Sequence, residues 1–188
     1  RGAFAEYITV PAANAFRLRD NTSLSDAALA EPLACVIRGQ NQVRPQPGEW
    51  ALVSGAGPLG LLHLQRLKLL GLRVIVTDLM DSRLPMAREL GADEVLNPAR
   101  DDLRGAVAAV TAGWGLELAV VANGQMQAVS QALDCLGLGG RILLFAGIYP
   151  RTELRVDPNV LHYGEKIAEG PPQMIRRDER VIASYLGE

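Results

Sequence analysis

The sequence predicts an α/β fold in which helices cover both faces of a doubly wound parallel sheet. Short apolar runs alternate with helical stretches of crossover length, a pattern that is typical of such sheets. One apolar run also ends in a glycine-rich turn that leads directly into a helix. The predicted strands cover residues 50–53, 73–77, 94–96, 116–122 and 141–145, and the predicted helices cover residues 61–70, 82–90, 103–112 and 125–136.

The chain before this pattern is expected to begin with strands. Residues 2–18 combine aromatic and β-branched residues with small ones, and Pro11 interrupts them. A helical region is expected over residues 25–43, with an interruption at Pro32. A connector rich in proline and glycine then leads into the first strand of the alternating region.

Glycines are expected to end the helices of the alternating region. Gly71, Gly91 and the glycines of residues 137–140 follow three of these helices, where a left-handed residue is common. Pro85 fits the second helix only if that helix starts near Ser82, because a proline inside a helix removes a hydrogen bond.

The glycine-rich turn has the G-x-G-x-x-G spacing of a dinucleotide-binding site. Gly55 permits the tight turn, Gly57 lets the backbone approach a pyrophosphate, and Gly60 lets the helix pack closely on the strand. The backbone amides of Pro58 and Leu59, at the positive end of the helix, are expected to hold the phosphates. The alternative is a purely structural strand-to-helix turn that binds no ligand. The surrounding strands and helices favour the Rossmann interpretation.

Asp78 ends the second predicted strand, 21 residues after Gly57. At about this spacing a carboxylate accepts hydrogen bonds from the adenosine ribose hydroxyls. Because the carboxylate would repel a 2′-phosphate, NAD is predicted in preference to NADP.

Four further residues are expected beside the bound dinucleotide. Arg83 is expected to flank the adenine. Ala122, Gly124 and Gly147 follow later strands and are expected to border the nicotinamide, because ligands of open α/β sheets bind at the carboxyl ends of the strands.

Composition limits the partners and the compartment. The net charge of −2 argues against a nucleic-acid or anionic-membrane surface, and no stretch is apolar for long enough to span a bilayer. Cys35 and Cys135 lie far apart in apolar helical contexts and are interpreted as buried free thiols, which favours a reducing, cytoplasmic location. His63 is interpreted as a helix surface residue.

Eight segments of the chain together carry a resemblance to a known family. They are residues 2–7, 10–11, 31–37, 55–60, 77–78, 87–93, 139–141 and 157–159. In these segments the chain resembles the medium-chain zinc-dependent alcohol and polyol dehydrogenases, with the sorbitol dehydrogenase branch nearest. The resemblance implies NAD-linked oxidation of an alcohol or polyol, with a catalytic zinc that polarises the alcohol oxygen.

The resemblance also implies metal ligands that this chain is not expected to supply. In the family, a cysteine and a His-Glu pair come from a GroES-like barrel domain, which would precede Arg1. Residues 1–23 are interpreted as the remnant strands of that truncated catalytic domain. Glu31 matches the family's glutamate near the metal, but a catalytic zinc site needs about three protein ligands. No zinc and no catalytic residue are therefore expected here.

The tail from residue 160 resembles the C-terminal end of branched-chain amino-acid ABC transporter ATPases. ATPase activity does not follow, because Leu61 and Leu62 come after Gly60 where a phosphate-binding loop needs lysine and a hydroxyl. The expected domains are a barrel remnant (1–23), a Rossmann domain (24–150) and an edge strand with the foreign tail (151–188). The tail is expected to cover the sheet edge or to mediate a homodimer there.

Three functions remain open on the sequence. The first is an NAD(H)-binding module that cannot complete hydride transfer alone. The second is an active oxidoreductase, formed when another chain supplies the barrel or when residues 1–20 and the tail rebuild a site. The third is a scaffold or interaction domain in which the turn persists without a ligand.

Overall fold

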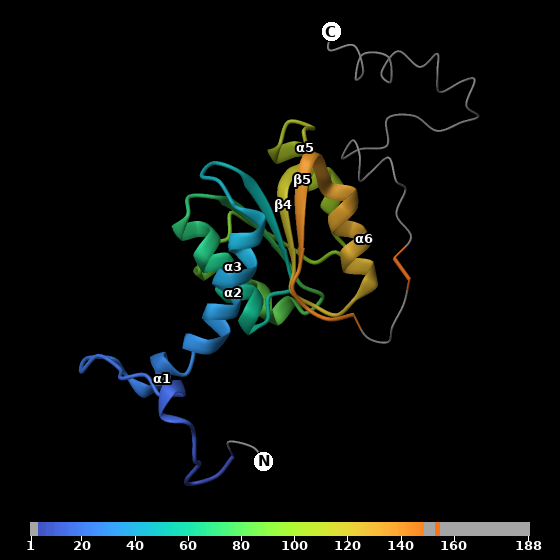
Figure 1. Ribbon diagram of the computed structural model, residues 1–188. Coiled ribbons are helices and arrows are strands. Elements are labelled where there is room, and N and C mark those ends of the chain that lie inside the picture. Colours follow the sequence, from blue (N-terminus) through green and yellow to red (C-terminus); the bar gives the residue numbers. More distant parts are fainter. Residues whose placement is uncertain (1–3, 149–152, 155–188) are drawn as a thin grey trace, which may run out of the picture.

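A five-stranded parallel sheet lies between two layers of helices (Figure 1). The computed structural model describes residues 4–148 and 153–154 of the chain. The strands lie in the order β3-β2-β1-β4-β5. Their bounds are β1 Trp50–Ser54, β2 Arg73–Thr77, β3 Glu94–Leu96, β4 Leu116–Val121 and β5 Leu136–Leu144.

Among the described residues, four α-helices connect the strands as crossovers, and two α-helices precede the first strand. None in the described ranges combines the length and the apolar character needed to cross a membrane. Their bounds are α1 Leu24–Ala27, α2 Ala30–Val43, α3 Pro58–Leu69, α4 Leu84–Glu89, α5 Leu103–Val110 and α6 Met126–Cys135, with short 3-10 turns η1 at Ala12–Asn14 and η2 at Asp81–Arg83.

The strand order reverses at β1. The chain runs outward from β1 to β2 and β3, and it then crosses back to β4 and β5 on the other side of β1. All four pairings are parallel, so the carboxyl ends of the strands share one edge. The predicted doubly wound sheet is confirmed, and β1 and β4 form its switch point.

The two faces of the sheet form two apolar clusters. Every residue of β1 is buried, as expected for a central parallel strand with helices on both sides. Ala51 and Val53 point into the cluster with α3, whereas Trp50 and Leu52 point into the cluster with α5 and α6. The alternation of side chains along one strand therefore serves both layers.

Two of the three predicted glycine stops are confirmed. Gly71 and Gly91 follow α3 and α4 with φ values of 81° and 97°. The prediction for residues 137–140 is wrong, because α6 ends at Cys135 and β5 begins at the next residue. A Cβ on Gly137 would lie 2.0 Å from the Trp114 carbonyl oxygen, so this glycine admits a close crossing of two chain segments.

The predicted strands before residue 18 are also wrong for the part that is described. Residues 4–20 are exposed, and η1 is their only regular element. They extend away from the sheet (Figure 1). A strand requires a partner for its backbone hydrogen bonds, and none of the described strands pairs with this segment.

The helical region after residue 23 divides earlier than predicted. The break falls between Ala27 and Ala30, where α1 ends and α2 begins. Pro32 lies in the first turn of α2, where its missing N–H costs no intrahelical hydrogen bond. Pro85 likewise occupies the first turn of α4, in agreement with the predicted late start of that helix.

His63 is fully buried between helices, which corrects the prediction of a surface residue. The Gln40 amide nitrogen of α2 lies 2.9 Å from the His63 Nδ1 atom and 3.1 Å from the His63 carbonyl oxygen. Arg66 donates to the Gln40 amide oxygen at 2.6 Å, which fixes the orientation of that amide. The ring of Phe145 packs edge-on at 4.4 Å. The histidine therefore belongs to the contact between α2, α3 and the end of β5.

This environment keeps the His63 imidazole neutral. Burial and, to a smaller extent, the charge of Arg66 lower its pKa to about 4. Because the Gln40 amide presents its nitrogen to Nδ1, Nδ1 must accept, and a proton there would place two donors face to face.

Protonation of His63 should make stability depend on pH. The unfolded chain takes up the proton near pH 6.5, and the folded chain takes it up only near pH 4. The free energy of unfolding should therefore fall by about 3 kcal/mol as the pH is lowered through this window. Urea denaturation at several pH values measures this loss, and His63→Leu should remove it. An equal loss in the wild type and the variant would contradict the assignment.

Candidate functional site

Three loops are joined at the carboxyl edge of the sheet. The N–H of Gly55 donates to the Thr77 carbonyl at 2.7 Å, and the N–H of Ala122 donates to the Ser54 carbonyl at 2.8 Å. The Asn123 amide donates to the carbonyl and the hydroxyl of Ser54 at 3.1 and 3.0 Å. The loops after β1, β2 and β4 are thus held together by the chain itself.

The three glycines of the turn have different surroundings. Gly55 has a φ of +106°, a conformation that favours glycine. A Cβ on Gly60 would lie 1.8 Å from the Gly55 carbonyl oxygen, so α3 can start here only without a side chain at that position. A Cβ on Gly57 would meet nothing within 4 Å. Gly60 is therefore a packing requirement, and Gly57 borders open space.

The start of α3 supplies backbone donors, with one correction to the prediction. Pro58 is the first helical residue and has no N–H, so it cannot donate to a phosphate. The N–H groups of Leu59 and Gly60 lie in the first turn, where the helix offers them no carbonyl one turn earlier. These N–H groups and the helix dipole form the kind of environment that binds anions.

The Asp78 carboxylate connects the glycine turn to the end of β2. Its Oδ2 atom accepts from the Ala56 N–H at 2.8 Å, and its Oδ1 atom accepts from the Met80 N–H at 2.8 Å. The guanidinium of Arg83 lies 3.4 Å from Oδ2. The Asp78 side chain is only 8% exposed. Its position is therefore fixed by backbone groups rather than by solvent.

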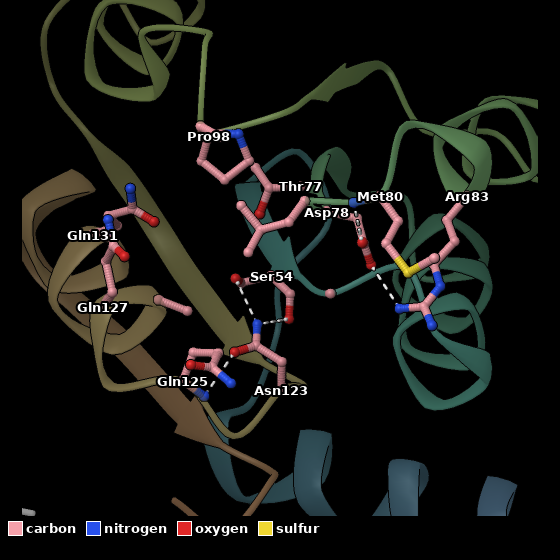
Figure 2. Close-up of a pocket in the computed structure, with 14 residues that line it drawn as sticks. Ser54, Thr77, Asp78, Met80, Arg83, Pro98, Asn123, Gln125, Gln127 and Gln131 are labelled. Carbon is pink, nitrogen blue, oxygen red and sulfur yellow. Dashed lines mark hydrogen bonds and ion pairs between the residues drawn. The ribbon is translucent and has the colours of Figure 1, made fainter.

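A pocket of about 340 Å³ opens beside this carboxylate. The turn, the end of β2, the loop after β3 and the start of α6 line it (Figure 2). The predicted residues Gly55, Asp78 and Arg83 are among the lining residues.

Sequence reasoning missed other lining residues, among them Pro98, Ala99, Asn123, Gln127 and Gln131. Asn123 had a usable signal, because it follows the strand at the switch point. The two glutamines had no usable signal in the sequence beyond their spacing of four residues on a helix.

The residues predicted beside a nicotinamide also come together. The site where Gly55 would carry a Cβ lies 3.3 Å from the Ala122 carbonyl oxygen. The corresponding site on Gly124 lies 3.0 Å from the Gly147 carbonyl oxygen. The loops after β1, β4 and β5 therefore approach one another within a few ångströms.

The zinc expected in the resembling family does not fit the described residues. The Cys35 thiol donates to the Glu31 carboxylate at 3.3 Å on α2, and both residues are exposed. This corrects the prediction that Cys35 is buried, whereas Cys135 is buried as predicted. The hydrogen bond to Glu31 is the main cause that raises the pKa of the Cys35 thiol, and this shift disfavours the thiolate that zinc requires. Within residues 4–148 and 153–154, no group of three or more potential ligands gathers around a common point.

Replacing Gly60 by alanine should disturb the fold itself. The added Cβ would overlap the Gly55 carbonyl, so we expect the free energy of unfolding to fall by about 1–3 kcal/mol. Urea denaturation provides the measurement. Gly57→Ala is the matched control, since its Cβ enters open space and should cost less. Equal losses in the two variants would contradict the different surroundings of these glycines.

Two sequence families match this chain. The zinc-binding dehydrogenases match residues 58–171. The branched-chain amino acid ATP-binding cassette transporters match residues 165–188, which lie outside the described residues. The two matches overlap over residues 165–171, a few residues after residue 160, where the tail is predicted to begin.

Individual relatives are dehydrogenases as well. The L-threonine 3-dehydrogenase of Chromobacterium violaceum is 35% identical over 150 residues, which cover 79% of this chain and 43% of the relative. That of Escherichia coli K12 is 34% identical over 157 residues, covering 83% and 45%.

Solved structures share the fold. An alcohol dehydrogenase of Escherichia coli CFT073, solved with NADH, has a TM-score of 0.78 and 29% identity over 86% of this chain and 48% of its own. The 2R,3R-butanediol dehydrogenase of Bacillus subtilis has a TM-score of 0.70 and 28% identity, covering 79% and 43%.

The chain spans about half the length of the relatives it matches. The predicted likeness to medium-chain dehydrogenases is confirmed, while its sorbitol dehydrogenase branch stays a prediction. The chain belongs to the zinc-binding dehydrogenase family, and its described part corresponds to the NAD(P)-binding domain of a medium-chain enzyme.

Proposed function

We propose that this chain binds NAD(H) at the carboxyl edge of its sheet. One observation carries the proposal: a glycine turn with open space at Gly57 is bonded directly to a buried carboxylate, Asp78, beside a pocket. A dinucleotide needs a donor-rich turn for its pyrophosphate and an acceptor for its ribose hydroxyls, and these two features supply both. A scaffold domain would need neither feature.

The proposed contacts follow the chemistry of each group. The N–H groups of Leu59 and Gly60 hold the pyrophosphate, which approaches over Gly57. Asp78 accepts from the adenosine ribose and disfavours a 2′-phosphate, so NAD binds in preference to NADP. Arg83, which lines the pocket, flanks the adenosine.

The nicotinamide end is proposed to lie by Ala122, Gly124 and Gly147. When bound, the nicotinamide accepts or gives a hydride. The chain's part in that chemistry is to bind and orient the ring at the loops after β4 and β5, which approach each other closely.

Hydride transfer to or from an alcohol is proposed to need metal ligands from outside residues 4–148 and 153–154. Glu31 has a single thiol neighbour, Cys35, and a catalytic zinc needs about three protein ligands. A second chain or another segment of a longer protein would supply them. The domain boundaries, the dimer through the sheet edge and the cytoplasmic location stay predictions.

A fluorescence titration with NADH tests binding. We expect saturable enhancement for the wild type and weaker binding for Gly57→Ala, whose methyl group enters the space proposed for the pyrophosphate. NADPH should bind at least about tenfold more weakly than NADH. Asp78→Asn should narrow the difference between the two nucleotides, because it removes the negative charge. A scaffold would show no saturable enhancement, and tighter binding of NADPH would oppose the role of Asp78.

Metal analysis and an NADH-formation assay test the catalytic part of the proposal. We expect substoichiometric zinc and no turnover of L-threonine, sorbitol or simple alcohols by this chain, because its described residues lack a ligand set. A full-length L-threonine 3-dehydrogenase serves as the positive control. One zinc per chain together with turnover would show that the chain is an active oxidoreductase.

A further inference from the structure

Two glutamines of α6, Gln127 and Gln131, line the same pocket as Asp78. They lie four residues apart on the helix and therefore share a face. Figure 2 shows them together on one side of the pocket, with Asp78, Met80 and Arg83 on the other side. A ligand held at Asp78 would thus extend toward two carboxamides.

The two carboxamides differ from the other amide beside them. Asn123 donates to Ser54 and accepts from the Gln125 N–H, so its polar atoms serve the loop. Among the hydrogen bonds of the described residues, none involves the side chain of Gln127 or Gln131. Their donors and acceptors are therefore available to a ligand.

The rest of this pocket wall suits a flat ring. Pro98 and Ala99 follow β3, Ala128 lies between the glutamines on α6, and Leu79 follows Asp78. These side chains offer apolar surface without a charge. A purine has apolar faces and a polar edge, so it pairs apolar walls with carboxamides at its rim.

We propose that Gln127 and Gln131 recognise the adenine base of the bound dinucleotide and make the site specific for adenine. The inference rests on the proposed function, because the ribose at Asp78 directs the base toward α6. A glutamine carboxamide can accept from the adenine N6 amino group and donate to N7 at the same time. One glutamine makes this pair, and the other lies one turn away on the same face to support it.

Hypoxanthine provides the matched probe for this recognition. It carries a carbonyl oxygen where adenine carries the N6 amino group, so its N7 edge presents two acceptors. Under this proposal only one glutamine pairs with the base edge, and its carboxamide has one donor group and one acceptor, so it keeps only one of its two hydrogen bonds in either orientation. Reduced nicotinamide hypoxanthine dinucleotide keeps the ribose, the pyrophosphate and the nicotinamide unchanged.

Fluorescence titrations of the full chain with NADH and with this analogue test the proposal. The wild type should bind NADH about tenfold or more tightly than the analogue. The double variant Gln127→Leu, Gln131→Leu should reduce this preference to near unity, chiefly through weaker NADH binding. Gln65→Leu, an exposed glutamine on α3 outside the pocket, should keep the preference. Thermal unfolding of each variant checks that the fold is intact.

The outcomes separate the two claims. Saturable NADH binding with equal affinity for the analogue would overturn base recognition and leave the proposed NAD(H) site standing. A preference that survives the double variant would assign recognition to other residues and would also overturn the inference. Absence of saturable binding by either nucleotide would overturn both.

Discussion

The contact between Gly60 and the Gly55 carbonyl oxygen constrains the carboxyl edge of the sheet. A side chain at Gly60 would lie 1.8 Å from that oxygen, so α3 can start against the turn only as it does here. From this start, α3 buries Leu64 and Leu67 on the sheet and His63 against α2. The same start places the first-turn N–H groups next to Gly57, the residue that precedes the helix and borders open space. Core packing and the direction of the donors therefore depend on one missing side chain.

The Asp78 carboxylate, the proposed ribose contact, also has a structural task at this edge. It already accepts from the N–H groups of Ala56 and Met80, which makes it part of the scaffold of the turn. An ionised carboxylate offers about four lone-pair sites, so two backbone donors leave room for ribose hydroxyls. Arg83 sits beside it at 3.4 Å and offsets part of the negative charge. A residue that was predicted as a ligand contact is thus also a structural one.

Much of the fold followed from the sequence because local patterns decided it. The buried runs of β1, β2 and β4 need no partner information to be recognised, since apolar residues bounded by turn signals have few alternatives. Residues 4–18 have a similar composition, but no described strand pairs with them, and composition does not report a partner. His63 and Cys35 were assigned to the wrong environments for a related reason. Whether one position on an amphipathic helix meets a neighbour depends on how α2 and α3 cross, and a single helix pattern does not contain that angle.

The candidate site likewise contains residues that the sequence could predict and residues that it could not. The turn and Asp78 could be predicted because a fixed spacing brings them together, whereas Gln127 and Gln131 reach the pocket only through the packing of α6 on the sheet. Pro58 shows that a position within the glycine motif does not always supply a backbone N–H donor, because proline has no N–H.

The bond between Ala56 and Asp78 also bears on the thermodynamics of association. Both partners of this bond belong to the chain itself, so the chain helps to hold the turn in place and a molecule that binds there has less of it to order. By thermodynamic linkage, any molecule that engages only the native state raises the midpoint of thermal denaturation. Occupancy of this edge and resistance to heat are therefore two measures of one equilibrium.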